Sequence, residues 1–561
     1  MTVNYGKIGD RFFLVGLILI CIFLPTSKYM LSVSQFYLLA LWMLLGLDMR
    51  SINKMFPEKP FFSRLFSRVI VSFAGIWNII KTRFTAFLHN KVAVIMVSMF
   101  LLHIFGLIYT SDFQYAFKDI RIKLPLLLFP IILSSMKPIG RKQFDLVVWL
   151  FTASLFFVTI LGAIKFIQRD FIDVRELSVF VSHIRVCLCI VFVIFVLAYY
   201  LVRRNYIPIL KILITALILW FLWYIYIIES FISIILIIAL CTALVINCIF
   251  KCKNNILRVS ALVFLLSSFA MASFYVYKIV KDYYSPEKIV VEDFDTHTKL
   301  GNPYIFDTIN YGIEDGRYLG LYLSQDEMIK AWNQLGSRKI NYEGDDTYWS
   351  LVRYLTSKDL RKDADGVSQL TTSDIRNIEN GIDNYNYIEN PGIKCRIMKI
   401  LVALETYQAT HNANGSSVFQ RVEYIKASLN LIKKHPVFGI GTGDLNNAFA
   451  DYYEETNSNL LPEYRLRSHN QYLAITIAFG LLGLLFFLFT LLYPYCSDKR
   501  YRNYFYSVFL LIMILSMFTE DTIESQIGVT IFAFFNSFLV FTSPYSQDDP
   551  EEMESLSREC K

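Results

Sequence analysis

Residues 467–484 read RSHNQYLAITIAFGLLGL, in which a basic and polar tetrapeptide meets one of the most apolar runs of the chain. An apolar run of about 20 residues is long enough to cross the hydrocarbon core of a membrane as a helix. Polar and ionisable groups are costly at such an entry and persist mainly where function or a partner holds them. The stretch therefore predicts a membrane span, and it raises the question of what keeps His469 and Asn470 at its start.

The composition of the whole chain indicates the same class of protein. Of its 561 residues, 55% are hydrophobic, 16% are aromatic and only 18% are charged, which is more apolar than a soluble protein. We predict an all-α polytopic membrane protein with about 12 transmembrane helices and a division between two of them at Glu229. The predicted spans cover residues 10–29, 31–49, 92–110, 124–136, 144–165, 184–202, 207–228, 230–250, 257–279, 471–493, 502–519 and 523–543.

The distribution of Lys and Arg predicts the orientation, because these residues accumulate in short cytoplasmic loops. They cluster in the even-numbered connections, so both termini are expected in the cytoplasm, and the formal net charge of +7 reflects this bias and indicates no nucleic acid. The residues concerned include Arg50, Lys54, Lys59, Arg64, Arg68, Lys137, Arg141, Lys142, Arg203, Arg204, Lys251, Lys253, Arg258, Lys499, Arg500 and Arg502. The predicted parts are an N-terminal bundle of about nine helices at 1–279, a large outer loop at 280–470, C-terminal helices at 471–543 and a cytoplasmic tail at 544–561.

The large outer loop is expected to be helical. Apolar residues recur at three- and four-residue spacing in 325–335, 372–382, 391–410 and 416–436, and alternation typical of strands is sparse. Thr372 or Ser373 is the expected cap of the second stretch. In the last stretch, Arg421 lies off a predicted apolar stripe, and a proline and several glycines end the helix. The stripe consists of Val418, Val422, Ile425, Leu429 and Ile432.

Three side chains on the outer face are candidates for chemistry. Arg185 begins a predicted span beside His183; it either marks the interface by extending its charged end to water or binds an anionic lipid headgroup with its fork of donors. Arg421 is either a solvated residue or a second cation of this kind. His469 either forms hydrogen bonds at the interface or takes a proton from an attacking hydroxyl, which a histidine can do near neutral pH.

Acidic residues on the same face have two interpretations. Glu520, Asp521 and Glu524 form either an exposed turn or a group that orients His469 or binds sugar hydroxyls. Asp444 ends the stretch GIGTGD and is expected to cap a helix or orient a neighbour. This stretch follows a helix rather than a strand, so a dinucleotide site is weakly indicated, and the sequence contains no HExxH, GxSxG or P-loop motif.

These motifs together resemble those of the O-antigen ligase and polymerase superfamily. The resemblance is carried by an arginine-bearing helix followed by KKHPVFGIGTGD, and then by SHNQYLAITIAFGLLGLLFF at the next span. SHIR at 182–185 resembles the outer-face arginine motif of the family, and residues 353–371 and 519–529 resemble its Bacteroidetes-type branch. The family's Ser-Arg-x-Gly motif is replaced here by ESFISII at 229–235, so the resemblance gives no acceptor-binding role to Glu229.

The resemblance implies a membrane glycosyltransferase of GT-C-like architecture in the bacterial inner membrane, with its active site at the periplasmic face. Such enzymes move a glycan from undecaprenyl diphosphate to lipid A-core or a similar acceptor, without a metal or another cofactor. Carried over by position, Arg185 and Arg421 bind the diphosphate, and His469 activates the acceptor hydroxyl. Attack from the face opposite the diphosphate predicts inversion at the anomeric carbon.

Two other functions fit parts of the same pattern. A polymerase that joins lipid-linked repeat units would use the same cations and base. A transporter of lipid-linked glycans is the alternative outside the enzymes, although transporters tend to have repeated halves and polar groups at the membrane midplane. This chain instead concentrates its polar groups at the outer edge, which favours an enzyme over a transporter. The stretches of the middle loop that resemble the Bacteroidetes-type ligases favour the ligase over the polymerase.

Overall fold

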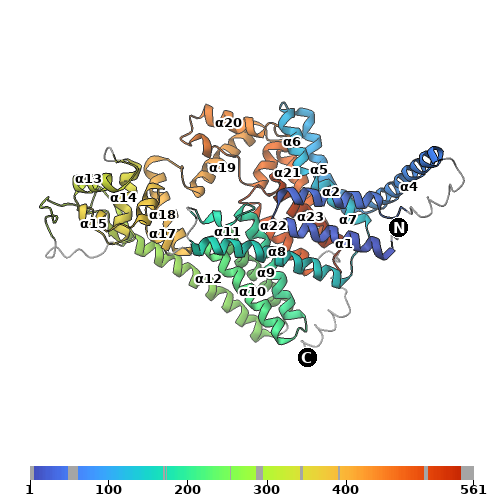
Figure 1. Ribbon diagram of the computed structural model, residues 1–561, viewed down its shortest axis with the longest axis horizontal. Coiled ribbons are helices and arrows are strands. Elements are labelled where there is room, and N and C mark those ends of the chain that lie inside the picture. The colour runs from blue at the N-terminus through green and yellow to red at the C-terminus, as the bar shows by residue number, and fades with distance from the viewer. Residues whose placement is uncertain are drawn as a thin grey trace.

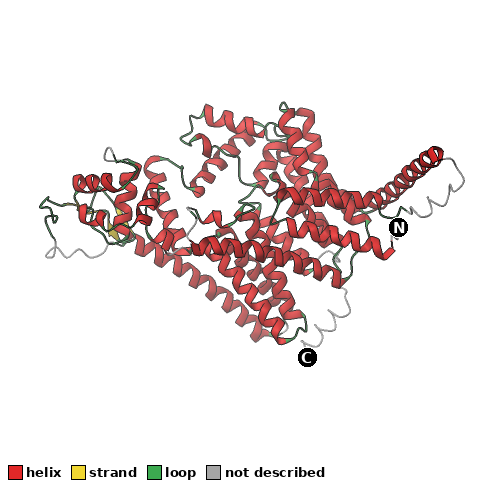
Figure 2. Cartoon of the chain, viewed as in Figure 1, coloured by secondary structure: helices red, strands yellow, loops and turns green. Residues whose placement is uncertain are grey.

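The computed structural model describes residues 6–47, 61–168, 171, 173–252, 254–285, 295–340, 345–389, 392–497 and 503–544. Helices dominate these residues (Figures 1 and 2). The first half contains α1 (Gly6–Phe23), α2 (Lys28–Leu44), α4 (Phe61–His89), α5 (Lys91–Phe105), η1 (Gly106–Tyr109), α6 (Phe113–Lys123), α7 (Pro125–Ser135), α8 (Arg141–Gln168), η2 (Val174–Leu177), α9 (His183–Arg203), α10 (Pro208–Ile227), α11 (Phe231–Lys251) and α12 (Asn255–Tyr284). The second half contains α13 (Gln325–Leu335), α14 (Asp346–Ser357), α15 (Ala364–Ser368), α16 (Thr372–Glu379), α17 (Asn386–Glu389), α18 (Ile393–Thr410), α19 (Ser417–Lys434), α20 (Leu445–Glu455), η4 (Pro462–Tyr464), α21 (Gln471–Ser497), α22 (Tyr504–Ser516), η6 (Thr522–Glu524) and α23 (Gln526–Phe541).

The described residues of the outer loop also contain four short strands, which the sequence did not predict. β1 (Ile305–Asp307) pairs antiparallel with β4 (Gly320–Leu323), and β2 (Ile313–Glu314) pairs antiparallel with β3 (Arg317–Tyr318). Strands of two to four residues are too short to give a recognisable alternation of polar and apolar residues. The loop is therefore predominantly rather than entirely helical (Figure 2).

Seven of the described helical segments are long and apolar enough to cross a membrane. They are Lys91–Tyr109, Arg141–Gln168, His183–Arg203, Pro208–Ile227, Phe231–Phe250, Asn255–Tyr284 and Gln471–Ser497, and each coincides with a predicted span. Helices α22 and α23 are shorter apolar helices, and α1, α2 and α7 occupy the remaining predicted spans. The predicted division at Glu229 is confirmed, since α10 ends before it and α11 begins after it. The count of about 12 transmembrane helices stays a prediction.

Several residues of the predicted topology lie outside the described residues. They are the tail from 545 to 561 and the basic residues Arg50, Lys54, Lys59, Lys253, Lys499, Arg500 and Arg502.

Helix α23 lies at the centre of the apolar core. Every residue from 527 to 540 is buried, as expected for a helix that is surrounded by others on all sides. Its Phe534 meets Phe129 of α7 at a ring distance of 5.3 Å, and Phe535 meets Phe151 of α8 at 5.1 Å. Because α23 follows directly after the segment 517–525, this packing fixes the acidic residues of that segment relative to the other helices.

The outer loop has a core of its own, and two details of its predicted helices are wrong. Trp332, Tyr348 and Leu351 are among its fully buried residues. The cap of α16 is Thr371 rather than Thr372 or Ser373, because Thr371 and Asp374 each accept a hydrogen bond from the backbone N–H of the other.

The predicted apolar stripe of α19 is also wrong in part: Val418, Val422 and Ile432 pack against the core, but Ile425 and Leu429 do not. The buried residues of α19 are Phe419, Tyr424, Ala427, Ser428 and Leu431, while Ile425 and Leu429 are exposed. Helix α19 packs against α18, α20 and α21. The spacing of apolar residues alone therefore predicted a buried face that differs from the observed one.

The glycine-rich turn after α19 fits against a break in α21. Gly480 has φ +68° inside α21, and Gly439 has φ +71° in the turn, a backbone region that favours glycine. The N–H groups of Ile440 and Gly441 donate to carbonyl oxygens of α21 at 3.0 and 2.9 Å, and a Cβ on Gly480 would overlap the Val437 carbonyl. The two glycine motifs of the sequence therefore form one joint, which ties the outer loop to the membrane span.

Candidate functional site

The polar residues that precede α21 form a tight turn against the segment 517–525. His469 has φ +43°, an uncommon backbone conformation for a residue with a side chain. Asn470 Nδ2 donates to the Phe518 carbonyl at 2.8 Å, and Gln471 Nε2 donates to Glu524 Oε1 at 3.1 Å. Asn470 and Gln471 are therefore held at the membrane entry by hydrogen bonds, and these bonds fix the backbone on which His469 sits.

Two arginines from distant parts of the sequence meet one buried carboxylate. Arg185 in the first turn of α9 lies 3.7 Å from Glu520, and Arg421 of α19 lies 3.0 Å from the same carboxylate. Arg185 also donates from Nε to Ser525 at 3.2 Å. Burial raises the pKa of Glu520 above its ordinary value, although the two arginines oppose this effect. Two guanidinium groups facing one carboxylate leave an excess of positive charge, which suits the binding of an anion.

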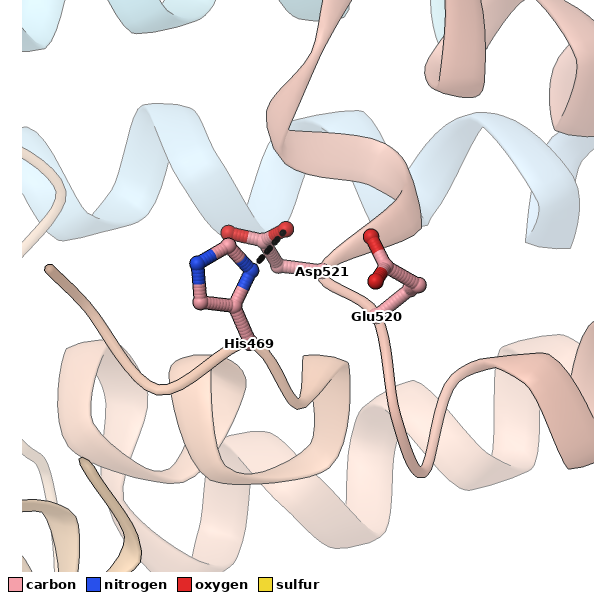
Figure 3. Close-up of side chains that lie close together, drawn as sticks. All are labelled: His469, Glu520 and Asp521. Carbon is pink, nitrogen blue, oxygen red and sulfur yellow. Dashed lines mark ion pairs between the residues drawn. The ribbon is translucent and has the colours of Figure 1, made fainter. Parts of the chain in front are cut away.

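His469 faces the carboxylate next to this group (Figure 3). Its Nδ1 lies 3.8 Å from Asp521 Oδ1, and its ring lies 5.5 Å from the ring of Tyr424. Burial lowers the pKa of His469, and the nearby arginines lower it further, while Asp521 opposes them. The imidazole is therefore neutral at pH 7 and can accept a proton, while Asp521 can orient it.

A buried network of charged residues contacts the turn that carries His469. Lys123 at the end of α6 lies 2.6 Å from Asp119 and 3.0 Å from Glu524. Glu524 also lies 3.6 Å from Arg467, which donates to the Tyr115 hydroxyl at 3.0 Å. Because Arg467 stands two residues before His469, this network positions the histidine through the backbone of the turn.

Asp444 orients a neighbouring loop and does not cap a helix with its side chain. Its carboxylate accepts hydrogen bonds from the Ser111 N–H at 2.8 Å, the Ser111 hydroxyl at 2.6 Å and the Asp112 N–H at 2.9 Å. Burial raises the pKa of Asp444, but these hydrogen bonds outweigh it and bring the pKa below its ordinary value. The residue links the end of the glycine-rich turn to the loop before α6 rather than contacting His469.

Two cavities adjoin the cluster. The larger, of about 630 Å³, is lined among others by His183, Arg421 and Glu520. The second, of about 500 Å³, is lined among others by His469 and Asp521. The consecutive residues Glu520 and Asp521 therefore line different cavities, and Arg421 and His469 do the same. His183 has no hydrogen bond or ion pair to the other predicted site residues among the described parts of the chain.

The side chains of His469, Glu520 and Asp521 could present ligand atoms to a metal, since these atoms lie within 4.8 Å of one another. Glu520, however, faces the guanidinium groups of Arg185 and Arg421. Neighbouring positive charges oppose the binding of a further cation. The two arginines beside these ligand atoms therefore favour an anion over a metal ion, and the metal-free site stays a prediction.

Three functional residues were missed by the sequence analysis as members of the site. Arg467 lies within the polar tetrapeptide, and Lys123 directly precedes a predicted span. Their positions at the edge of the membrane were the signal by which the sequence could have identified them. Asp119 precedes Lys123 by one helical turn and gave no separate signal.

Comparison with known proteins bears on the same part of the chain. Residues 372–488, about a fifth of the chain, match the family model described as O-antigen ligase. This segment contains Arg421, Asp444, His469 and Asn470, whereas Arg185 and Glu520 lie outside it. A search of curated proteins gave no match. This segment is similar to the O-antigen ligase family, and the match supports the resemblance to the O-antigen ligase superfamily that the sequence motifs indicated.

Proposed function

We propose that the protein is an O-antigen ligase-type glycosyltransferase, which moves a glycan from undecaprenyl diphosphate to a lipid A-core or similar glycan acceptor. The family consists of membrane ligases and polymerases of this kind, and the apolar helices are those of a membrane protein. The observation that carries the proposal is the meeting of Arg185, Arg421 and Glu520 beside the pair of His469 and Asp521. These residues come from four separate parts of the chain.

The two arginines would bind the diphosphate of the donor. As the bond between the anomeric carbon and the diphosphate oxygen breaks, negative charge grows on the leaving diphosphate. Fixed cations in a partly buried site stabilise this charge more than water does, because they need no reorganisation. Glu520 would hold both guanidinium groups in position until the donor binds.

His469 would act as the base. The acceptor oxygen forms a bond to the anomeric carbon and loses its proton to Nε2, while Nδ1 faces Asp521. A distance of 3.8 Å is long for a hydrogen bond, but such contacts often shorten only when substrate is bound. Since His469 lines the second cavity, we assign the acceptor to that cavity and the donor to the larger one, so that the acceptor would attack from the face opposite the diphosphate. The expected result is inversion, and retention of configuration in the product would contradict this mechanism.

The remaining features of the proposal follow from the topology. We place the chain in the bacterial inner membrane with about 12 transmembrane helices in a GT-C-like arrangement and both termini in the cytoplasm. The N-terminal bundle ends near residue 279, and the loop from 280 to 470 stands in the periplasm. The site then lies at the periplasmic face, where the lipid-linked donor and the acceptor are both within reach.

Gene deletion and complementation would test the proposal. Strains that carry wild type, H469A or the matched control H435A would be compared for membrane protein level and for lipopolysaccharide separated on a gel. His435 ends α19 and is exposed, so H435A should behave as wild type.

The gel separates the candidate functions. Loss of every glycan-bearing band in the deletion and in H469A, with polymer kept on the carrier lipid, would support a ligase with a chemical role for His469. A single repeat unit still attached to the core would support the polymerase instead. An unchanged ladder would overturn the proposed substrate.

A further inference from the structure

The larger cavity is lined by basic side chains beyond those of the proposed diphosphate site, together with the carboxylates Asp173, Glu229, Asp383 and Glu520. Besides Arg421, it is lined by the basic residues Arg175, Arg396 and Lys399. On its apolar side it is lined by residues of α11, including Phe231, and elsewhere by polar residues of the outer loop. A space with this lining suits a ligand that has both a lipid part and more than one anionic group.

The three additional cations differ in their partners. Arg175 lies 3.6 Å from Asp173, and Lys399 lies 3.4 Å from Glu229. Arg396 forms no ion pair with any residue that the structure describes; its one hydrogen bond runs from Nη2 to the Ser417 hydroxyl at 3.2 Å. Its Nε is buried and has no hydrogen-bond partner within the described chain. Arg396 is therefore a partly buried charge with an unused donor.

The position of Arg396 relates it to the proposed diphosphate site. Its partner Ser417 and Arg421 stand four residues apart on α19 and therefore on the same face, ~6 Å along the axis. Burial lowers the pKa of Arg396 and the neighbouring Arg175 and Arg421 lower it further, while Glu229 opposes them. An unpaired charge in such surroundings is costly, and an anion would offset this cost.

We infer that Arg396 is the centre of a second oxyanion subsite, which binds a phosphate or carboxylate group of the lipid-linked donor. This inference rests on the proposed function, because the donor cavity is the one that Arg421 and Glu520 line. The group bound is either the second phosphate of the diphosphate or an acidic group on the attached glycan. Both sources offer oxygen atoms that the Nε and Nη donors of a guanidinium can bind together.

Binding of three donors to the purified full-length protein in lipid nanodiscs would test the subsite. The probes are undecaprenyl diphosphate, undecaprenyl diphosphate carrying a neutral disaccharide, and the same lipid with glucuronic acid as the outer sugar. The variants are R396Q, R396K and R421Q, with R376Q as the matched control because Arg376 is exposed on α16 and does not line the cavity. Loss of a hydrogen-bonded charged partner should weaken binding of at least one probe about 10- to 100-fold in R396Q and leave R376Q unchanged.

Each outcome decides a separate point. Equal weakening for all three probes in R396Q would identify the diphosphate as the bound group, and weakening for the acidic glycan alone would identify the glycan. Wild-type binding of all three probes by R396Q would overturn the subsite. If R396Q does not fold, R396K decides: an ammonium group cannot reproduce two fixed donors, so binding equal to wild type would overturn the subsite as well. Unchanged binding of undecaprenyl diphosphate in R421Q would instead overturn the proposed diphosphate site, whatever the result for Arg396.

Discussion

Replacement of Lys123 by methionine should destabilise the protein strongly. The Lys123 side chain is only 1% exposed, and its ammonium lies between Asp119 at 2.6 Å and Glu524 at 3.0 Å. Removal of one partner of a buried ion pair leaves an uncompensated charge and costs about 3–5 kcal/mol. Glu524 keeps Arg467 at 3.6 Å, whereas Asp119 has no other ion pair within the described chain. We therefore expect the cost of one stranded carboxylate rather than of two.

The loss of stability in K123M should become smaller as the pH falls. In the wild type, burial raises the pKa of Glu524, but Lys123 and Arg467 outweigh burial and lower it to about 2. A lowered folded-state pKa contributes stability above the unfolded value of about 4.3, and this contribution is lost only as the pH falls toward 2. Burial already raises the pKa of Asp119 in the wild type although Lys123 opposes this effect, and loss of the lysine in K123M raises this pKa further. Protonation of Asp119 on acidification then removes its uncompensated charge. The difference between the variant and wild type should shrink from pH 7.5 to pH 5.

Thermal or chemical unfolding in one detergent would measure the effect, with K118M as the matched control. Lys118 stands on the same helix and is exposed, so its replacement should change the free energy of unfolding by less than about 0.5 kcal/mol. The double variant D119L/K123M removes both charges and should recover most of the loss, because an apolar pair can replace a buried ion pair. K123M as stable as K118M at pH 7.5 would refute the reasoning.

Three further predictions concern the site and the joint that holds it. Because burial and the arginines lower the pKa of His469, the transfer rate should stay constant as the pH falls from 7.5 to 6.5. The rate should reach half its maximum only below pH 6.5, and a half-maximal rate at or above pH 6.5 would contradict this. G480A should lose about 1–3 kcal/mol or more of stability in a thermal-unfolding assay, since φ is +68° and the Val437 carbonyl occupies the space, while G140A should have little effect; equal stability of the two variants would show that the joint is not rigid. D444N should lower the unfolding temperature relative to D451N, because an amide cannot accept all the hydrogen bonds that the carboxylate receives, and proteolysis in the loop 110–112 should rise; equal behaviour of the two would dismiss this role of Asp444.

The sequence by itself determined the class of protein and the positions of most helices. Long apolar runs must form helices in a membrane because no water satisfies their backbone groups there, so the seven segments long enough to span it were located within a few residues. The helices of the outer loop at 325–335 and 416–436 were located by the spacing of their apolar residues. The motif around His469 resembles the O-antigen ligase family, and residues 372–488 match the model of that family.

Only the tertiary structure decided which residues act together. Arg185, Arg421 and Glu520 are separated by 236 and 99 residues (421 − 185 and 520 − 421), and no local pattern encodes that they meet. The orientation of α19 also depended on its neighbours, because Ile425 and Leu429 have the spacing of a buried face but are exposed. The same holds for Lys123 and Arg396. The sequence does not reveal whether a charged side chain forms an ion pair, is buried without a partner or is solvated, because the packing of the helices decides this.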